Sequence, residues 1–181
     1  MDALREIGNI GSGNAASALS ALLSCPFTIS VPTVRILDYS EVAGDMGGPE
    51  QMIVGALLFL EGDVQGMILF LLQEGFASAT LEALLGEPVN SLDGLDEMAQ
   101  SALQEVANIM AASYLNAIAS LTGMTITIST PSLCTDMLGV ILSVPAIYYA
   151  NISDKIIHIE DELRGENLCA PNHILLIPDT G

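Results

Sequence analysis

Basic residues are scarce in this chain. It has 181 residues, with 4 Lys and Arg against 22 Asp and Glu, which gives a formal net charge of −18 at pH 7. Because affinity for nucleic acid depends on Lys and Arg that neutralise phosphates, this composition argues against nucleic acid and against anionic membranes as partners. Such acidity occurs both in the cytosol of halophiles and in ordinary acidic domains, so composition leaves both sources open.

Tryptophan is absent, and cysteine and other aromatic residues are few. The chain has 4 Phe, 4 Tyr and 3 Cys. Cys25, Cys134 and Cys169 are scattered and form no CxxC pair, so neither a disulfide framework nor a thiolate metal site is expected, and a reducing cytoplasm is the expected location. A core has to come from Leu, Ile, Val, Ala and Met, and a hydrophobic content of 51% supplies it.

Long hydrophobic runs are also missing. The longest apolar stretch, residues 137–152, is interrupted by Gly139, Ser143, Pro145 and Asn151. It falls short of the roughly 20 residues that a membrane-spanning helix needs, so no membrane insertion is expected. The N-terminus shows no basic region followed by an apolar stretch, so no secretory signal is expected either.

The chain repeats itself at an offset of 99 residues. When residues 4–34 are laid over residues 103–133 without gaps, 10 of 31 positions are identical. Random pairing at this composition gives about two or three identities. We therefore expect one domain, residues 1–181, made of two copies of one unit, with residues 1–90 and 91–181 as the halves. The identical pairs are Leu4/Leu103, Glu6/Glu105, Asn9/Asn108, Ile10/Ile109, Ala18/Ala117, Leu22/Leu121, Thr28/Thr127, Ile29/Ile128, Ser30/Ser129 and Pro32/Pro131.

Each unit is expected to begin with a helix and to continue into a strand. Apolar and small residues at helical spacing predict the helix, and β-branched residues in alternation predict the strand. In the first copy the predicted buried stripe of the helix is Leu4, Ile7, Gly11, Ala15, Ala18 and Leu22. The predicted strands are residues 27–37 and 126–133, a strand pair in 52–72 around an EGD turn, and a second pair at 154–163 and 173–179.

The remaining elements follow from caps and breakers. A helix over 74–86 is closed by Gly86, and residues 87–95 form a linker. An extra short helix is predicted over 134–144, ending near Pro145. The helix of the second copy is expected to begin near 91–96, further upstream than the first copy can reach before Met1. No counterpart of the helix at 74–86 precedes Gly181, so the chain is expected to start inside a helix and to stop before one.

The glycine-rich string GSGNAA at residues 11–16 could be taken for a nucleotide-binding loop. Such a loop needs a strand before its first glycine, whereas the residues before it have a helical pattern, and the second copy has Met110 and Ala112 instead of glycines. A glycine inside a helix costs up to about 1 kcal/mol relative to alanine. The glycines at positions 8, 11 and 13 therefore predict a close approach by another backbone or by a partner.

Both copies keep a Glu/Asn pair that a core does not need. Glu6 and Asn9, like Glu105 and Asn108, are three residues apart, so each pair emerges from one face of its helix. A single pair of this kind would be ordinary solvated surface. The pair recurs in the same register although neighbouring surface positions have changed, which favours a shared function.

The chemistry of these pairs is limited. An amide is no general base, and a lone Glu without His, Lys or metal is a poor hydrolytic centre. His158 and His173 lie far from both pairs in sequence and are predicted to be surface or packing residues rather than metal ligands. A carboxamide can nevertheless hold a water in line with a phosphorus atom when the metal and phosphate belong to another molecule. We therefore predict an incomplete phosphoryl-transfer site, in which Glu contacts a partner's cation.

The pairs belong to a longer motif: Asp or Ser, three residues, Glu, two residues, Asn, 22 residues and Pro. This pattern resembles the signature of the CheC-like phosphatases of bacterial and archaeal chemotaxis, and the resemblance covers nearly the whole chain. It implies an α/β fold of two pseudo-twofold-related halves that share a continuous antiparallel sheet, with the two motif helices on one surface. The motif occurs at Asp2, Glu6, Asn9 and Pro32 and again at Ser101, Glu105, Asn108 and Pro131.

The resemblance also implies an activity, hydrolysis of the aspartyl phosphate of the response regulator CheY. Asn9 and Asn108 would orient the attacking water, and Glu6 and Glu105 would pair with a lysine of the regulator. The Mg²⁺ would belong to the regulator, so the chain would need no cofactor of its own.

Within the family, the doubled motif resembles the CheC branch. CheX proteins carry one motif and dimerise, and FliY proteins add a C-terminal domain. The receptor deamidase CheD is a second partner implied by the resemblance. The alternative function is a non-catalytic adaptor that binds CheD or the flagellar or archaellar motor switch.

Overall fold

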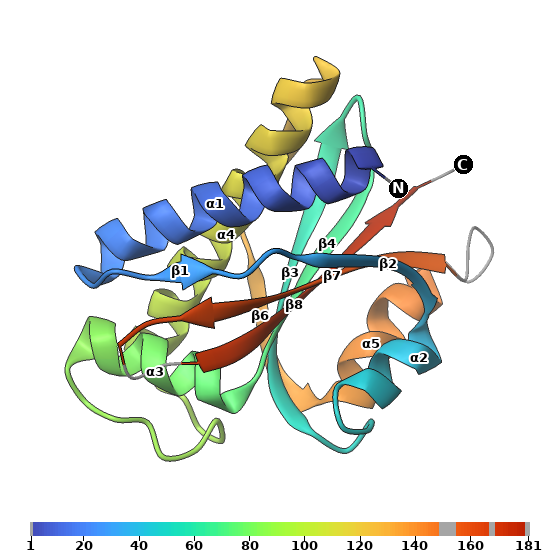
Figure 1. Cartoon of the computed structure of the whole chain (residues 1–181). Coiled ribbons are helices and arrows are strands. Elements are labelled where there is room, and N and C mark those ends of the chain that lie inside the picture. Colours follow the sequence, from blue (N-terminus) through green and yellow to red (C-terminus); the bar gives the residue numbers. More distant parts are fainter. Residues whose placement is uncertain (1, 149–154, 167–168, 180–181) are drawn as a thin grey trace.

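A computed structural model describes residues 2–148, 155–166 and 169–179 (Figure 1). Helices and strands alternate along the chain in two similar series. The first series is α1 (Asp2–Leu23), β1 (Thr28–Ile29), β2 (Thr33–Asp38), α2 (Tyr39–Asp45), β3 (Met52–Gly62), β4 (Gly66–Leu72) and α3 (Glu74–Leu85). The second is α4 (Glu97–Thr122), β5 (Ile126–Ile128), β6 (Ser132–Met137), α5 (Leu138–Tyr148), β7 (Lys155–Arg164) and β8 (Cys169–Pro178).

All strands join one antiparallel sheet of eight strands. Its path is β1, β7, β8, β4, β3 and β5, with β2 also pairing with β7 and β6 also pairing with β3. The first strands of each series therefore pair with the other series, while β4 and β8 meet at the centre, where Leu69 lies opposite Leu175. This arrangement confirms the predicted fold class with a continuous antiparallel sheet. The division into halves at residues 90 and 91 stays a prediction.

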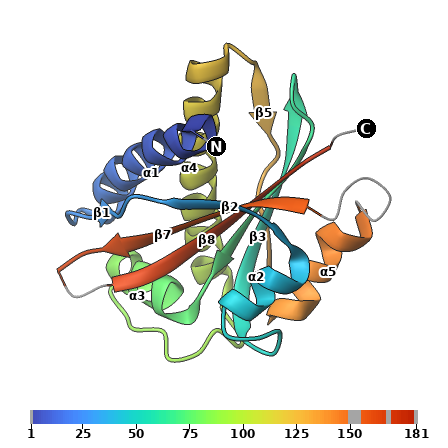
Figure 2. The same cartoon turned by 45° about the vertical axis from the view of Figure 1, so that its right-hand side comes forward.

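Helices cover both faces of the sheet. One face carries α1, α3 and α4, and the opposite face carries α2 and α5 (Figures 1 and 2). The central strand β4 shows the consequence: Phe70 packs under the first set of helices, and the neighbouring Leu69 and Leu71 pack under the second. Because both faces are buried, β4 has a continuous apolar sequence instead of alternation. No helix in the described parts of the chain is long and apolar enough to cross a membrane.

The buried face of α1 differs from the predicted stripe. Leu4, Ile7, Ala18 and Leu22 are only half-buried. Gly11 and Ala15 are buried as predicted, and the other four positions of the stripe are wrong because α1 packs against α4 as well as against the sheet, which turns its small residues inward. The residues of α1 that are buried are Gly8, Gly11, Ser12, Ala15, Ala16, Leu19 and Leu23.

Two of the three glycines of α1 allow a close approach by other parts of the chain. A Cβ added to Gly11 would lie 2.5 Å from Cδ1 of Tyr114 in α4. A Cβ added to Gly8 would lie 2.9 Å from Cγ of Pro32. Gly13 differs, because a Cβ there would meet no atom of the protein within 4 Å. A close approach at Gly8 and Gly11 is thus present, but it is made by side chains of this chain and not by another backbone or by a partner, and packing within the chain gives no reason for Gly13.

The caps around the linker match their sequence signals. α3 ends at Leu85, and Gly86 follows it in the left-handed conformation with a φ of 76°. α4 begins at Glu97, where the side chain of its N-cap residue Asp96 accepts a hydrogen bond from the backbone N–H of Ala99 at 2.8 Å. The predicted linker and helix start are therefore confirmed.

The predicted helix over 134–144 is wrong in its bounds. Residues 132–137 form β6, and α5 starts at Leu138 and continues through Pro145 to Tyr148. Pro145 does not end the helix because it is buried together with Ile141 and Leu142 against the sheet, which outweighs the missing N–H. The helix is not extra either, since α2 starts at Tyr39, 99 residues before α5.

Candidate functional site

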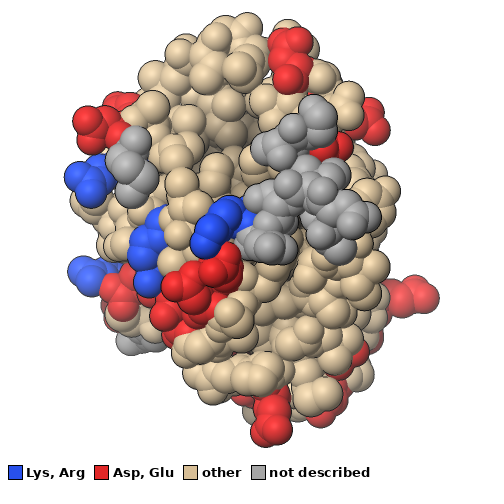
Figure 3. All heavy atoms as spheres, turned by 90° about the vertical axis from the view of Figure 1, so that its right-hand side faces the viewer, with Lys and Arg blue, Asp and Glu red and all other residues tan. Residues whose placement is uncertain are grey.

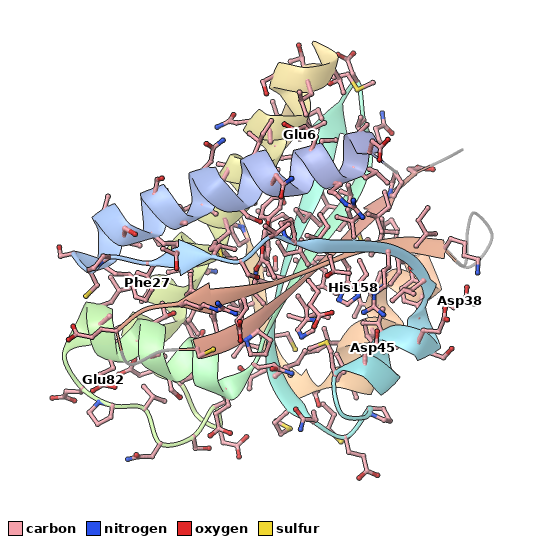
Figure 4. All side chains as sticks on the ribbon, viewed as in Figure 1. Glu6, Phe27, Asp38, Asp45, Glu82 and His158 are labelled. Carbon is pink, nitrogen blue, oxygen red and sulfur yellow. The ribbon has the colours of Figure 1, made fainter. Side chains whose placement is uncertain are left out.

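The two Glu/Asn pairs lie on two helices that cover the same face of the sheet. Glu6 and Asn9 are exposed on α1, and Figure 4 shows Glu6 near the N-terminal end of that helix. On α4, Glu105 is exposed and Asn108 is half-buried. Both amides therefore reach the surface, as their spacing predicted, and each carboxylate lies one helical turn before its amide.

The motif prolines are held beside their own helices. Pro32 is buried against Gly8, and the backbone carbonyl of Pro131, also buried, accepts a hydrogen bond from Nε2 of Gln104 at 3.1 Å. The 22 residues between Asn and Pro are thus the rest of the helix and the short strand that returns beside it. The spacing that the two motif copies share therefore places a proline-containing loop beside each motif helix.

Two serines that the sequence reasoning did not assign fix these loops. The backbone N–H of Ser30 donates to the carbonyl of Glu162 at 3.0 Å, and the N–H of Glu162 donates to Oγ of Ser30 at 2.9 Å. Ser129 makes the same two bonds with Phe59, at 3.0 and 2.9 Å. Ser30 and Ser129 are an identical pair in the internal alignment, so the repeat was the signal that could have found them.

An open groove with a volume of about 310 Å³ lies beside the second pair. It is formed by one side of α4 and by the loop between β5 and β6. Glu105 is its single charged residue, and the amide of Asn108 belongs to the same wall. The groove could accept a loop of another protein while a water and a cation contact these two side chains. Its lining residues are Ser101, Gln104, Glu105, Asn108, Ile128, Ser129, Thr130 and Pro131.

The motif helices carry little charge although the chain is strongly acidic. The charged residues of α1 are Asp2, Arg5 and Glu6, and those of α4 are Glu97 and Glu105, so no charged residue follows the motif glutamate in either helix. The basic residues elsewhere are engaged, because Lys155 lies 2.8 Å from Asp38 and Arg35 lies 2.6 Å from Asp45. Figure 3 shows blue side chains directly against red ones on that face. The parts of α1 and α4 that follow Glu6 and Glu105 are uncharged and would therefore not repel an acidic partner.

The two histidines lie on the opposite face, away from both pairs. His158, labelled in Figure 4, and His173 are buried on the face of the sheet that carries α2 and α5. Their rings stack with centroids 5.3 Å apart. Of the two alternatives predicted, surface or packing residues, burial confirms packing, and a hydrogen bond of 3.0 Å joins Nε2 of His158 to Nδ1 of His173. Among the described residues, no three His, Cys, Asp or Glu side chains are grouped as metal ligands.

Burial of this histidine pair makes stability depend on pH. Desolvation, with contributions from His173 and Arg35, lowers the pKa of His158 to about 4. In the unfolded chain His158 binds a proton near pH 6.5, whereas in the folded protein it does so only near pH 4. The neutral, buried His158 therefore makes its full contribution to the free energy of unfolding above pH 6.5, and this contribution is lost as the pH falls toward 4. We expect the free energy of unfolding in urea to be about 2 kcal/mol lower at pH 5 than at pH 7. His158→Gln should reduce this difference, and an unchanged difference would contradict the assignment.

Comparison with known proteins identifies the family. The model of the CheC-like family matches residues 1–36 and 98–134, the two segments that hold the motifs. The chain is 33% identical to the CheY-P phosphatase CheC of Bacillus subtilis, over 99% of this chain and 88% of that protein. The protein belongs to the CheC-like family of chemotaxis phosphatases.

Two flagellar relatives extend the comparison. The flagellar motor switch phosphatase FliY of Bacillus subtilis is 30% identical over 72% of this chain and 34% of its own length. The crystal structure of Thermotoga maritima FliY superimposes with a TM-score of 0.77 at 26% identity, covering 97% of this chain and 88% of that structure. The fold therefore matches a relative in three dimensions as well as in sequence.

Proposed function

We propose that this protein hydrolyses the aspartyl phosphate of a CheY-like response regulator. The observation that carries the proposal is the same Glu/Asn pair, presented twice at the surface of helices on one face and fixed each time beside a buried proline. The name of the Bacillus subtilis relative, a CheY-P phosphatase, supports the same activity. The cytoplasm, where such a regulator would be met, stays a prediction.

Asn and Glu would have different roles in this reaction. The amide of Asn9 or Asn108 has one acceptor and two donors, so it can hold a water in line with the phosphorus atom. Glu6 or Glu105, one turn earlier, would bind the ammonium group of a lysine on the regulator and so fix the approach of the helix. A neutral amide adds no negative charge next to the phosphate. The Mg²⁺ that phosphoryl transfer requires would be supplied by the regulator.

The test is a phosphate-release assay. Phosphorylated CheY with Mg²⁺ is incubated with and without the full chain, and inorganic phosphate is followed over time. We expect the chain to accelerate phosphate loss about tenfold or more, because positioning of the water is the main contribution to this reaction. An unchanged decay rate would exclude the proposed activity.

A second function, binding of a protein partner as an adaptor, is favoured by the surface of α5. Val140, Val144, Ile147 and Tyr148 of this helix are between 42% and 77% exposed. Val140 and Val144 also line an apolar pocket between α5 and the sheet, with a volume of about 130 Å³. Such a surface is typical of protein interaction sites. The candidates are CheD and the motor switch.

A charge on this surface should separate the two functions. We expect Val144→Glu to weaken capture of CheD in a pull-down about tenfold or more, because a carboxylate would be buried in the contact. Phosphate release should be unchanged, since α5 lies on the face opposite the motif helices. Ser40→Glu, which adds the same charge at an exposed position of α2, is the matched control. Equal capture of CheD by parent and Val144→Glu would place the contact elsewhere.

A further inference from the structure

Four buried polar side chains meet where α1 and α4 pack together. Oγ of Ser12 and the hydroxyl of Tyr114 lie 2.8 Å apart, and both donate to Oδ2 of Asp161, at 2.8 and 2.7 Å. Nδ2 of Asn172 donates to Oδ1 of Asp161 at 3.0 Å. None of the four residues is more than 3% exposed. The cluster thus joins the two motif helices to β7 and β8 in the interior.

The ring of Tyr114 is also held in place by its contact with α1. The space that a Cβ of Gly11 would occupy is filled by the Tyr114 ring, with Cδ1 at 2.5 Å and Cγ at 2.9 Å from that position. The ring therefore lies directly on the backbone of α1, and its hydroxyl is fixed between Ser12 and Asp161. Rotation or sliding of one helix relative to the other would break this contact and the hydrogen bonds together.

The cluster is not required by the repeated architecture. At the offset of 99 residues, Ser12 corresponds to Ala111 and Tyr114 corresponds to Ala15, and both alanines are completely buried. The chain therefore packs the equivalent positions without polar groups. Burial raises the pKa of the Asp161 carboxyl, and its hydrogen bonds oppose that rise, so the cluster brings a desolvation cost that an apolar core avoids.

The cluster lies close to both sites along the helices. Ser12 follows Asn9 by three residues, which is about 4.5 Å along α1, and Tyr114 follows Asn108 by six residues, about 9 Å along α4. A helix is stiff over such lengths, so displacement at the cluster moves the amide at the surface. A single set of hydrogen bonds is thus shared by two sites that otherwise have separate loops and separate prolines.

We propose that Ser12, Tyr114 and Asp161 are positioning residues that couple the two Glu/Asn sites, so that a change in the position of α1 at Asn9 alters the position of α4 at Asn108. The inference rests on the proposed function of those sites. Coupling through a contiguous network of packed and hydrogen-bonded groups is the physical route. The two sites then do not act independently, and binding of a regulator at one changes turnover at the other.

The experiment uses Ser12→Ala, which removes one hydroxyl from α1 and leaves every residue of α4 unchanged. The first measurement is the NMR signal of the side-chain amide of Asn108, which we expect to shift. Tyr114→Phe should reciprocally shift the amide signal of Asn9. Thr80→Val is the control, because Thr80 has a buried hydroxyl in α3 with no hydrogen-bond partner among the described residues, and we expect it to move neither signal.

The second measurement is turnover by one isolated site. In the Asn9→Ala background only the site on α4 remains, and we expect Ser12→Ala to lower its kcat about threefold or more with little change in KM. A purely structural contact would lower the melting temperature and leave kcat unchanged. If neither the Asn108 signal nor this kcat changes, the coupling is wrong. If the parent shows no phosphatase activity, the proposed function fails, and the NMR signals alone decide the coupling.

Discussion

Replacing both motif amides, Asn9→Ala together with Asn108→Ala, should return phosphate loss from a phosphorylated regulator to the rate of the regulator alone. The alanine side chains cannot hold the attacking water, and the carboxylates that remain, Glu6 and Glu105, are assigned to a lysine of the regulator. The expected loss is the whole acceleration, about tenfold or more. The measurement is phosphate release under the conditions used for the parent.

Each single variant should retain measurable turnover at the other site. Asn14→Ala and Asn116→Ala are matched controls, because both residues are exposed amides on the same two helices and lie outside the motif. Both control variants should keep the parent rate. Circular dichroism would show whether the variants are folded. A folded double variant with the parent rate would remove Asn9 and Asn108 from the mechanism.

Much of the candidate site was predictable because the sequence repeats. Glu6/Glu105 and Asn9/Asn108 could be separated from ordinary surface only by comparison of one copy with the other, and the helical spacing then placed each pair on one face. The local patterns also predicted the caps and the strand pair in 52–72 correctly, whereas the predicted strands 27–37 and 126–133 are each divided in two and part of β6 was predicted as helix. Gly86 and Asp96 act where the sequence placed them, because a left-handed C-cap and an N-cap are decided by neighbouring residues alone.

Long-range contacts could not be read from the same patterns. β2 of the first series pairs with β7 of the second, and β6 of the second series pairs with β3 of the first. The paired residues are more than 70 positions apart in the chain, so no local sequence pattern predicts these pairings. The cluster of Ser12, Tyr114 and Asp161 was not predicted either, because its three residues are far apart in the sequence and none of these residue types is by itself a sign of burial. The short helix α2 was missed although Asp38 and Glu41 form a capping box, a signal that was present in the sequence.

The contact between α1 and α4 allows a stability test with a built-in control. Gly11→Leu should lower the free energy of unfolding by about 3 kcal/mol, because its Cβ would overlap the ring of Tyr114, which cannot move without leaving Asp161. Gly13→Leu should be neutral or stabilising by up to about 1 kcal/mol, since a side chain there meets no atom and leucine favours the helix. Both values come from urea unfolding.

Removing the ring of Tyr114 should show whether Gly11→Leu destabilises through overlap with that ring or because position 11 tolerates no side chain. Tyr114→Ala alone is expected to destabilise, because it leaves a cavity and takes one hydrogen bond from Asp161. In that background Gly11→Leu should cost much less than in the parent, since leucine can enter the space that the ring has left, and the two changes should be far from additive. Additive losses would mean that Gly11 is required by α1 itself. The glycine at position 11 of α1 would then not be explained by packing against α4, the helix that carries Asn108.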